Sequence, residues 1–122
     1  MTAKTPANEE NVRSISRITG ADMSSGAEYR FCTVQADGTV VVSGANANAL
    51  GVIRGKAGLG HAIEVGISGR MLVVLGGTVA AGAEVESDSS GAAVTKSSGP
   101  SLGISLTGGS AGDVSDVVFD RG

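Results

Sequence analysis

The sequence predicts an all-β protein: a compact antiparallel β-barrel or sandwich of about eight short strands with an extended N-terminal arm. Short runs of Val, Ile and Leu recur between residues 30 and 117, and glycine interrupts them every few residues. The chain has 20 glycines in 122 residues, and those between the runs are expected in turns that need a positive φ. Runs and turns alternate at intervals of about 8 to 12 residues, which is typical of an all-β domain.

Two regions differ in composition. Residues 1–25 are polar and are predicted to form the N-terminal arm, whereas residues 26–122 carry the apolar runs and are predicted to form the body. Because the arm has no apolar face large enough to fold alone, we expect it to be flexible until it orders against a partner. Deleting residues 2–20 is therefore expected to leave the melting temperature of the body nearly unchanged.

The arm contains two competing patterns. Helical spacing joins Val12, Ile15 and Ile18, although the serines and the threonine near them weaken a helix. Arg13, Ile15 and Arg17 alternate equally well as one face of a strand.

The body contains the predicted strands. In chain order they cover residues 29–35, 39–43, 50–54, 62–67, 71–75, 84–87, 92–95, 102–106 and 114–119. Asp37-Gly38 between β-branched runs is a strong hairpin signal. In the fourth segment Glu64 is expected to face outward between inward-facing apolar residues. Gly69 is expected to turn the chain into the fifth segment.

The predicted core is thin. Hydrophobic residues make up 41% of the chain but are mostly Ala and Val, and the only aromatic residues are Tyr29, Phe31 and Phe119. Such a core buries little apolar area per residue, so its margin over conformational entropy is expected to be small. Oligomerisation or docking on a larger surface is the usual compensation.

Charge is unevenly distributed along the chain. Residues 1–70 carry seven basic and six acidic side chains, a net of +1, whereas residues 71–122 carry two basic and six acidic ones, a net of −4. A nucleic-acid-binding protein would show a dense basic stripe, often with stacking aromatics, so no nucleic-acid partner is expected. The asymmetry suits head-to-tail or other charge-complementary protein contacts.

The single cysteine, Cys32, cannot form an intramolecular disulfide and is predicted to be a small buried hydrophobe in the first body strand. No signal-peptide pattern occurs before Gly20, and the longest apolar run, 71–75, is too short to span a bilayer. The protein is expected to be made and kept in a soluble, reducing compartment, with no membrane partner.

One catalytic motif is present in its letters. Gly108–Gly112 reads G-x-S-x-G around Ser110, but a nucleophile elbow needs a strand, a sharp turn and a helix, with its histidine later in the chain. The only histidine, His61, comes earlier, and no helix is expected after Gly112. We therefore expect a Gly/Ser hairpin loop and predict that the protein is not an enzyme.

No metal or cofactor is expected. One histidine and one cysteine cannot form a zinc site without several carboxylates from distant positions. Glu84 and Glu86 are predicted to be the solvated side chains that flank a buried Val85, and not a general acid/base pair.

The order of these strands and turns resembles that of the small capsid decoration, or cement, proteins of tailed bacteriophages. The pieces that carry the resemblance are Gly26–Phe31, Asp37–Val40, Ala49–Val52, Ile63–Gly69, Gly77–Val85, Ser87-Asp88 with Gly91, and Leu102–Leu106 with Gly112-Asp113. Together they span roughly residues 26–119, and the arm lies outside the match.

The resemblance implies a structural virion protein, made in the host cytoplasm, that binds the outer surface of an assembled phage head and stabilises contacts between major capsid protein subunits. The expected partners are the major capsid protein and further copies of the chain, with a trimer as the expected state. Six residues are the candidate contacts with the capsid or a neighbouring copy: Arg13, Ile15, Arg17, Arg54, Lys56 and Arg70. The arm residues would add a strand to a neighbour's sheet, and the later basic residues would face acids of a neighbour or of the capsid protein.

A phage-surface domain that binds carbohydrate or a receptor is the alternative interpretation, because it would show a similar all-β pattern. Such sites usually present an aromatic platform, for which this chain offers few candidates.

Overall fold

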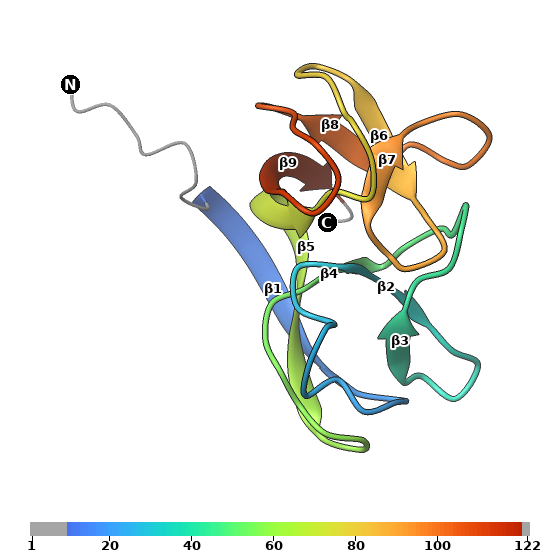
Figure 1. The fold of residues 1–122 in the computed structure, drawn as a ribbon. Helices are drawn as coiled ribbons and strands as arrows, with labels where there is room; N and C mark the ends of the chain where they lie inside the picture. The colour runs from blue at the N-terminus through green and yellow to red at the C-terminus, as the bar shows by residue number, and fades with distance from the viewer. Residues whose placement is uncertain (1–9, 121–122) are drawn as a thin grey trace.

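The structure is a computed structural model that describes residues 10–120, and over this range it contains strands and turns but no helix. Its nine strands are β1 (Glu10–Ile18), β2 (Phe31–Val34), β3 (Val40–Val42), β4 (Gly51–Ile53), β5 (Ala62–Val74), β6 (Glu84–Ser87), β7 (Ala93–Thr95), β8 (Gly103–Ser105) and β9 (Val114–Asp120). They form one sheet in the order β3-β2-β4-β5-β9-β8-β6-β7, and β1 pairs with β5 off this path (Figure 1). The all-β prediction is confirmed. Over residues 10–120 the structure offers no helix that could span a membrane.

Strand β5 runs through the whole molecule (Figure 1). Residues 62–70 pair with β1, residues 65 and 66 also pair with β4, and residues 68–74 pair with β9. We call the residues before Gly69 the first part of β5 and the residues after it the second part. The predicted turn at Gly69 is wrong, because Gly69 stays in the ladder opposite Phe119. With a φ of 114°, a conformation that glycine adopts without strain, it lets the strand change direction and still remain paired.

The N-terminal segment is also more closely integrated than expected. Strand β1 pairs antiparallel with β5 from Ile18 opposite Ala62 to Glu10 opposite Arg70, and Met23 is buried in the core. The predicted boundary at residue 25 therefore does not separate an arm from a body over residues 10–25, and of the two competing patterns the strand alternation is confirmed. Residues 1–9 of the predicted arm lie outside the described residues.

The chain has two halves that repeat one another in their strand pairing: the first comprises β1–β4 and the first part of β5, and the second comprises the second part of β5 and β6–β9. In the first half β2 pairs with β3 and β4, β4 pairs with β5, and β5 pairs with β1. In the second half β6 pairs with β7 and β8, β8 pairs with β9, and β9 pairs with β5. Thus β2, β3 and β4 correspond to β6, β7 and β8, β9 corresponds to the first part of β5, and the second part of β5 corresponds to β1. Figure 1 shows β1–β4 at one end of the molecule and β6–β9 at the other.

The turns repeat as well. The amide of Tyr29 donates to Ile53 O at 2.8 Å, and the amide of Gly82 donates to Ser105 O at 2.7 Å, in the same place of the second half. Tyr29 has a φ of 66° and Gly82 a φ of 86°. The same turn therefore has a residue with a left-handed backbone in both halves. Glycine adopts this conformation without strain in the second half, whereas the first half has Tyr29 there.

Two clusters of buried side chains form the core. The smaller one lies within the first half and includes Met23, Cys32, Val40, Ile53, Ile63 and Val65. The larger one joins Phe31 and Val52 of the first half to Met71, Val117 and Phe119 of the second. Its two phenylalanine rings lie with their centroids 6.1 Å apart, so a shared core connects the halves.

Cys32 is buried in β2, as predicted. Burial raises the pKa of its thiol to about 12, because the buried site disfavours the thiolate.

Candidate interaction surface

Strand β1 places three of the predicted contact residues along one edge of the first half. Arg13 and Ile15 are exposed, the latter by 37% of its surface, and Ile18 at the end of the strand is also exposed. Arg17 is half-buried, and its guanidinium donates a hydrogen bond to the carbonyl of Gly38 in the β2–β3 turn. The sequence pattern of β1 therefore yields a strand with an accessible apolar side chain between two arginines.

The basic residues after β4 lie elsewhere. The Arg54 guanidinium donates to Glu64 Oε2 at 2.8 Å, across the β4–β5 pair, and Lys56 is exposed in the following loop. Arg54 was expected to face an acid of a neighbour, but it pairs with an acid of its own chain.

Arg70 lies in the second half. Its Nη1 is 3.7 Å from Asp116 Oδ2, and the Asp116 side chain is 3% exposed and also accepts a hydrogen bond from Thr107 Oγ1 at 2.7 Å. Arg70 therefore also pairs within the chain. The six predicted residues are not brought together in one site, and their role in contacts with a capsid or a second copy stays a prediction.

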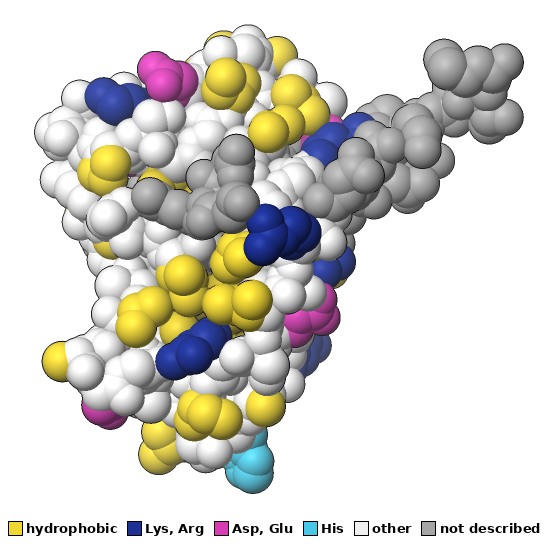
Figure 2. All heavy atoms as spheres, turned by 180° about the vertical axis from the view of Figure 1, so that it is seen from behind, with side chains coloured by type: hydrophobic (Ala, Val, Ile, Leu, Met, Phe, Trp, Pro, Cys, Tyr) yellow, Lys and Arg dark blue, Asp and Glu magenta, His cyan; other side chains and the backbone are white. Residues whose placement is uncertain are grey.

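An apolar surface that the sequence pattern did not reveal lies over β8 and β9. Four large side chains there are 41% to 47% exposed, and we call them the β8–β9 face: Ile104, Leu106, Val114 and Val118. Ile104 stands directly opposite Val118 in the ladder. These residues were assigned to predicted strands, but nothing in a three-residue strand distinguishes its exposed side from its buried side. Figure 2 shows one face of the molecule, on which several groups of hydrophobic side chains lie with Lys and Arg side chains between them.

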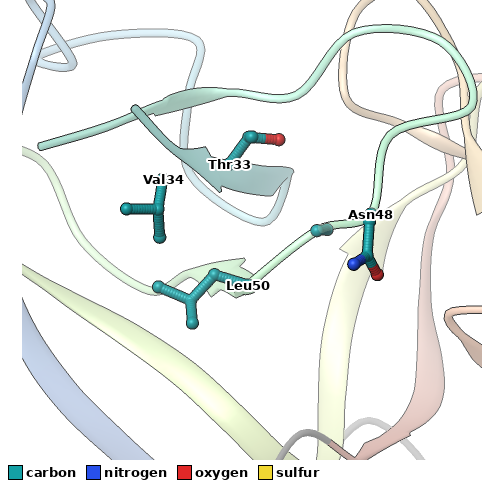
Figure 3. A pocket seen from close by; sticks show the side chains of 5 residues that line it. Thr33, Val34, Asn48 and Leu50 are labelled. Atoms are coloured by element: carbon teal, nitrogen blue, oxygen red, sulfur yellow. The ribbon is translucent and has the colours of Figure 1, made fainter. Parts of the chain in front are cut away.

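A small pocket of about 260 Å³ lies between β2 and the segment before β4. Its lining is Thr33, Val34, Asn48, Ala49 and Leu50, with Val34 and Leu50 as its larger apolar side chains (Figure 3). It contains one hydroxyl and one amide but no titratable side chain. Ligand pockets usually exceed about 300 Å³ and combine apolar walls with several convergent polar groups, so we assign no chemistry to this one.

The G-x-S-x-G letters form the turn between β8 and β9. The amide of Ser110 donates to Asp113 Oδ2 at 2.8 Å, and strands lie on both sides of the turn. This is the predicted hairpin loop, without the strand-to-helix geometry that activates a nucleophile.

The prediction that Glu86 is a solvated side chain is wrong. Glu84 is exposed as predicted, but Glu86 is buried and accepts hydrogen bonds from the amides of Ser97 and Gly99, both at 2.8 Å. These bonds hold the pKa of the Glu86 carboxyl below its ordinary value. Its role is to anchor the loop after β7, which a pattern of alternating acids does not indicate.

The aromatic residues give no platform for a sugar. Phe31 and Phe119 are buried in the core, and Tyr29 is half-buried. The carbohydrate-binding alternative therefore gains no support from the structure.

By its fold the chain is an all-β module of two similar halves, with apolar strand residues exposed at both ends of the repeat. No protein-family model and no curated protein matches it. Among solved structures it is similar to the N base of the head fibre protein gp8.5 of bacteriophage phi29, with a TM-score of 0.70 and 15% sequence identity. The match covers 90% of this chain and 95% of the phage chain. At this identity, the likeness shows a shared fold over nearly the whole of both chains.

Proposed function

We propose that this chain is a structural protein of a bacteriophage head, located on the outer surface of the capsid. The observation that carries the proposal is the shared fold with the base of a phage head fibre, over 90% of this chain. The order of motifs over residues 26–119 supports it independently, because it resembles capsid decoration proteins.

The proposed partners are the major capsid protein and further copies of this chain, with three copies as the proposed state. A protein that binds only the assembled shell adds its binding free energy to that state alone, so it stabilises the shell against disassembly. Many copies in fixed geometry strengthen this effect through multivalency. The proposed stabilisation of contacts between capsid subunits follows from this linkage.

Binding, and not catalysis, is the proposed role of the surface. The exposed β1 residues and the β8–β9 face offer apolar contact area, which is what a docking protein needs. The one motif with a catalytic spelling is a hairpin turn between strands.

The test uses heads of the virus that encodes the chain, purified from a strain that lacks its gene. Purified protein should co-sediment with these heads to a saturating number of copies, and decorated heads should release DNA at a higher temperature than bare heads. Electron microscopy should show added density on the outside of the shell. Failure to co-sediment at micromolar concentrations would refute the proposal.

A further inference from the structure

The contact between the two halves is a well-defined pair of surfaces. On the first half Phe31 and Val52 contribute to it, and on the second half Met71 and Val73 do. All four belong to the larger core cluster and have no exposed surface. The Met71 sulfur occupies the place that a Cβ on Gly66 would take, and Gly66 is the ladder partner of Val52. The second part of β5 therefore covers the β4–β5 face of the first half.

The repeat identifies the counterpart of each of these residues. Val52 opposite Gly66 corresponds to Ile104 opposite Val118, and Met71 opposite Val117 corresponds to Ile15 opposite Val65. Val73 opposite Ser115 corresponds to Arg17 opposite Ile63. The carbonyl of Phe31 accepts a hydrogen bond from the amide of Ser43, and that of Glu84 accepts one from the amide of Lys96, both at 2.9 Å, so Phe31 corresponds to Glu84.

The counterparts are accessible where the originals are buried. Ile104 is 44% exposed and Ile15 is 37% exposed, Glu84 is exposed and Arg17 is half-buried. One copy of the chain thus leaves open a first surface, made by Ile104 and Glu84, and a second surface, made by Ile15 and Arg17. These are the two sides of the contact that is closed once inside the chain.

We propose that copies of this chain associate head to tail. The second surface of one copy, on β1, covers the first surface of the next copy, on β6 and β8, just as the second part of β5 covers the first half inside the chain. Ile15 then packs against Ile104 and Val118, the counterparts of Val52 and Gly66. Val118 fills the space that the Met71 sulfur takes beside Gly66 inside the chain, so the shorter Ile15 contacts this valine from outside. Arg17 comes near Glu84, because the amide of Val74 donates to the carbonyl of Tyr29 inside the chain and so joins the segments that contain their counterparts, Val73 and Phe31.

Charge supports a second copy as the occupant. Val73 and Phe31 belong to the same buried cluster inside the chain, and their counterparts on the open surfaces, Arg17 and Glu84, carry opposite charges. Along the sequence, residues 1–70 carry a net +1 and residues 71–122 a net −4, so the net negative charge lies in the part of the chain that contains Glu84. Complementary charges of this kind fix register and disfavour pairing of like surfaces. The two surfaces differ, so the interface is heterologous and closes into a ring when the rotation between copies allows.

This inference specifies the self-contact within the proposed function, but it is tested on free protein, without heads. Ile15→Asp removes one surface and Ile104→Asp removes the other. The parent should sediment as an oligomer at micromolar concentration, and each variant alone should sediment as a monomer, because every contact needs one surface of each kind. An equimolar mixture of the two variants should form a one-to-one dimer through the surfaces left intact.

Leu59→Asp is the control, because Leu59 is a more exposed apolar residue outside both surfaces, and this variant should associate like the parent. The dimer in the mixture also shows that both variants are folded. A monomeric parent, variants that associate like the parent, or a mixture that stays monomeric would each overturn the inference. If a monomeric parent binds heads, the self-association is overturned while the proposed binding to the capsid stands. If the parent is an oligomer but does not bind heads, the proposed function is refuted while the self-association stands.

Discussion

Gly51 and Gly103 occupy the same position in the two halves, and the strand beside each of them leaves no room for a side chain. A Cβ on Gly51 would collide with the carbonyl oxygen of Gly66, and one on Gly103 would collide with that of Val118. We expect Gly51→Ala and Gly103→Ala each to lower the free energy of unfolding by about 1 to 3 kcal/mol, since the backbone must shift to relieve the overlap.

Denaturant titration would measure both effects. Gly55→Ala is the matched control, because no atom lies within 4 Å of the added Cβ and its φ is not left-handed. Equal stability of all three variants would show that the close approach of the strands is not a constraint.

Glu86 makes stability depend on pH. Amide donors at Ser97 and Gly99 favour its ionised form in the folded state and hold its pKa below the ordinary 4.5. The stabilisation is complete above the ordinary pKa and disappears as the pH falls through the lowered value of the folded state. Glu86→Gln should therefore melt at a lower temperature than the parent at pH 7, and the difference should shrink as the pH is lowered below about 4.

Thermal melting between pH 7 and pH 2 would measure this. Glu28→Gln, which changes an acid outside both proposed self-contact surfaces, should change the melting temperature at pH 7 less than Glu86→Gln does. A constant difference between Glu86→Gln and the parent would contradict the prediction.

Strand β1 is part of the sheet, so its removal should be costly. It pairs with β5 along its length, and Val12 packs against the larger core cluster. A chain that begins at residue 19 should melt at a clearly lower temperature than one that begins at Glu10, which keeps all the strands described over residues 10–120. Identical melting curves would instead support the flexible arm that the composition of residues 1–25 suggested.

The individual strands could be predicted from the sequence because their signals are local. The hairpin from Phe31 to Val42 follows from Asp37-Gly38 between β-branched runs, and it forms where expected. The continuity of β5 could not be predicted, because a glycine such as Gly69 marks a turn and a bend within a strand alike. Only part of the candidate surface could be predicted. The alternation around Ile15 indicates the strand β1, but no local pattern indicates the ion pair of Arg70 with Asp116, because these residues are far apart in the chain.

The two halves share a core, so we expect the whole molecule to unfold in one transition. Phe31 lies in the first half but packs with Phe119 of the second. Phe31→Ala should lower the free energy of unfolding by about 3 to 5 kcal/mol, typical of a buried phenylalanine, and the single transition should persist. Calorimetry and denaturant titration would test this, and two separate transitions in the parent would show that the halves are independent.

The repeat could not be predicted from the sequence, because the two halves share backbone conformations and strand pairing but few identical side chains. The shared signals are glycine pairs at matching turns and strands: Gly20 with Gly76, Gly38 with Gly91, Gly51 with Gly103 and Gly60 with Gly112. Most other positions differ, since one half buries its outer face and the other exposes it. Because the chain has 20 glycines, these four matched pairs cannot be recognised among them from the sequence alone.

Because Cys32 is buried, the rate at which its thiol is alkylated measures how often the folded molecule opens. A thiol alkylating reagent reacts with the thiolate, and the folded chain both hides this sulfur and disfavours its ionisation. At pH 8 the native protein should be alkylated at least about a thousandfold more slowly than the unfolded chain, if its stability is in the usual range of about 5 to 15 kcal/mol. Because this is the only cysteine, mass spectrometry of alkylated protein would count open molecules directly, in free solution or on a capsid, with no engineered label. Modification within seconds in native buffer would mean that the first half opens far more easily than its packing implies.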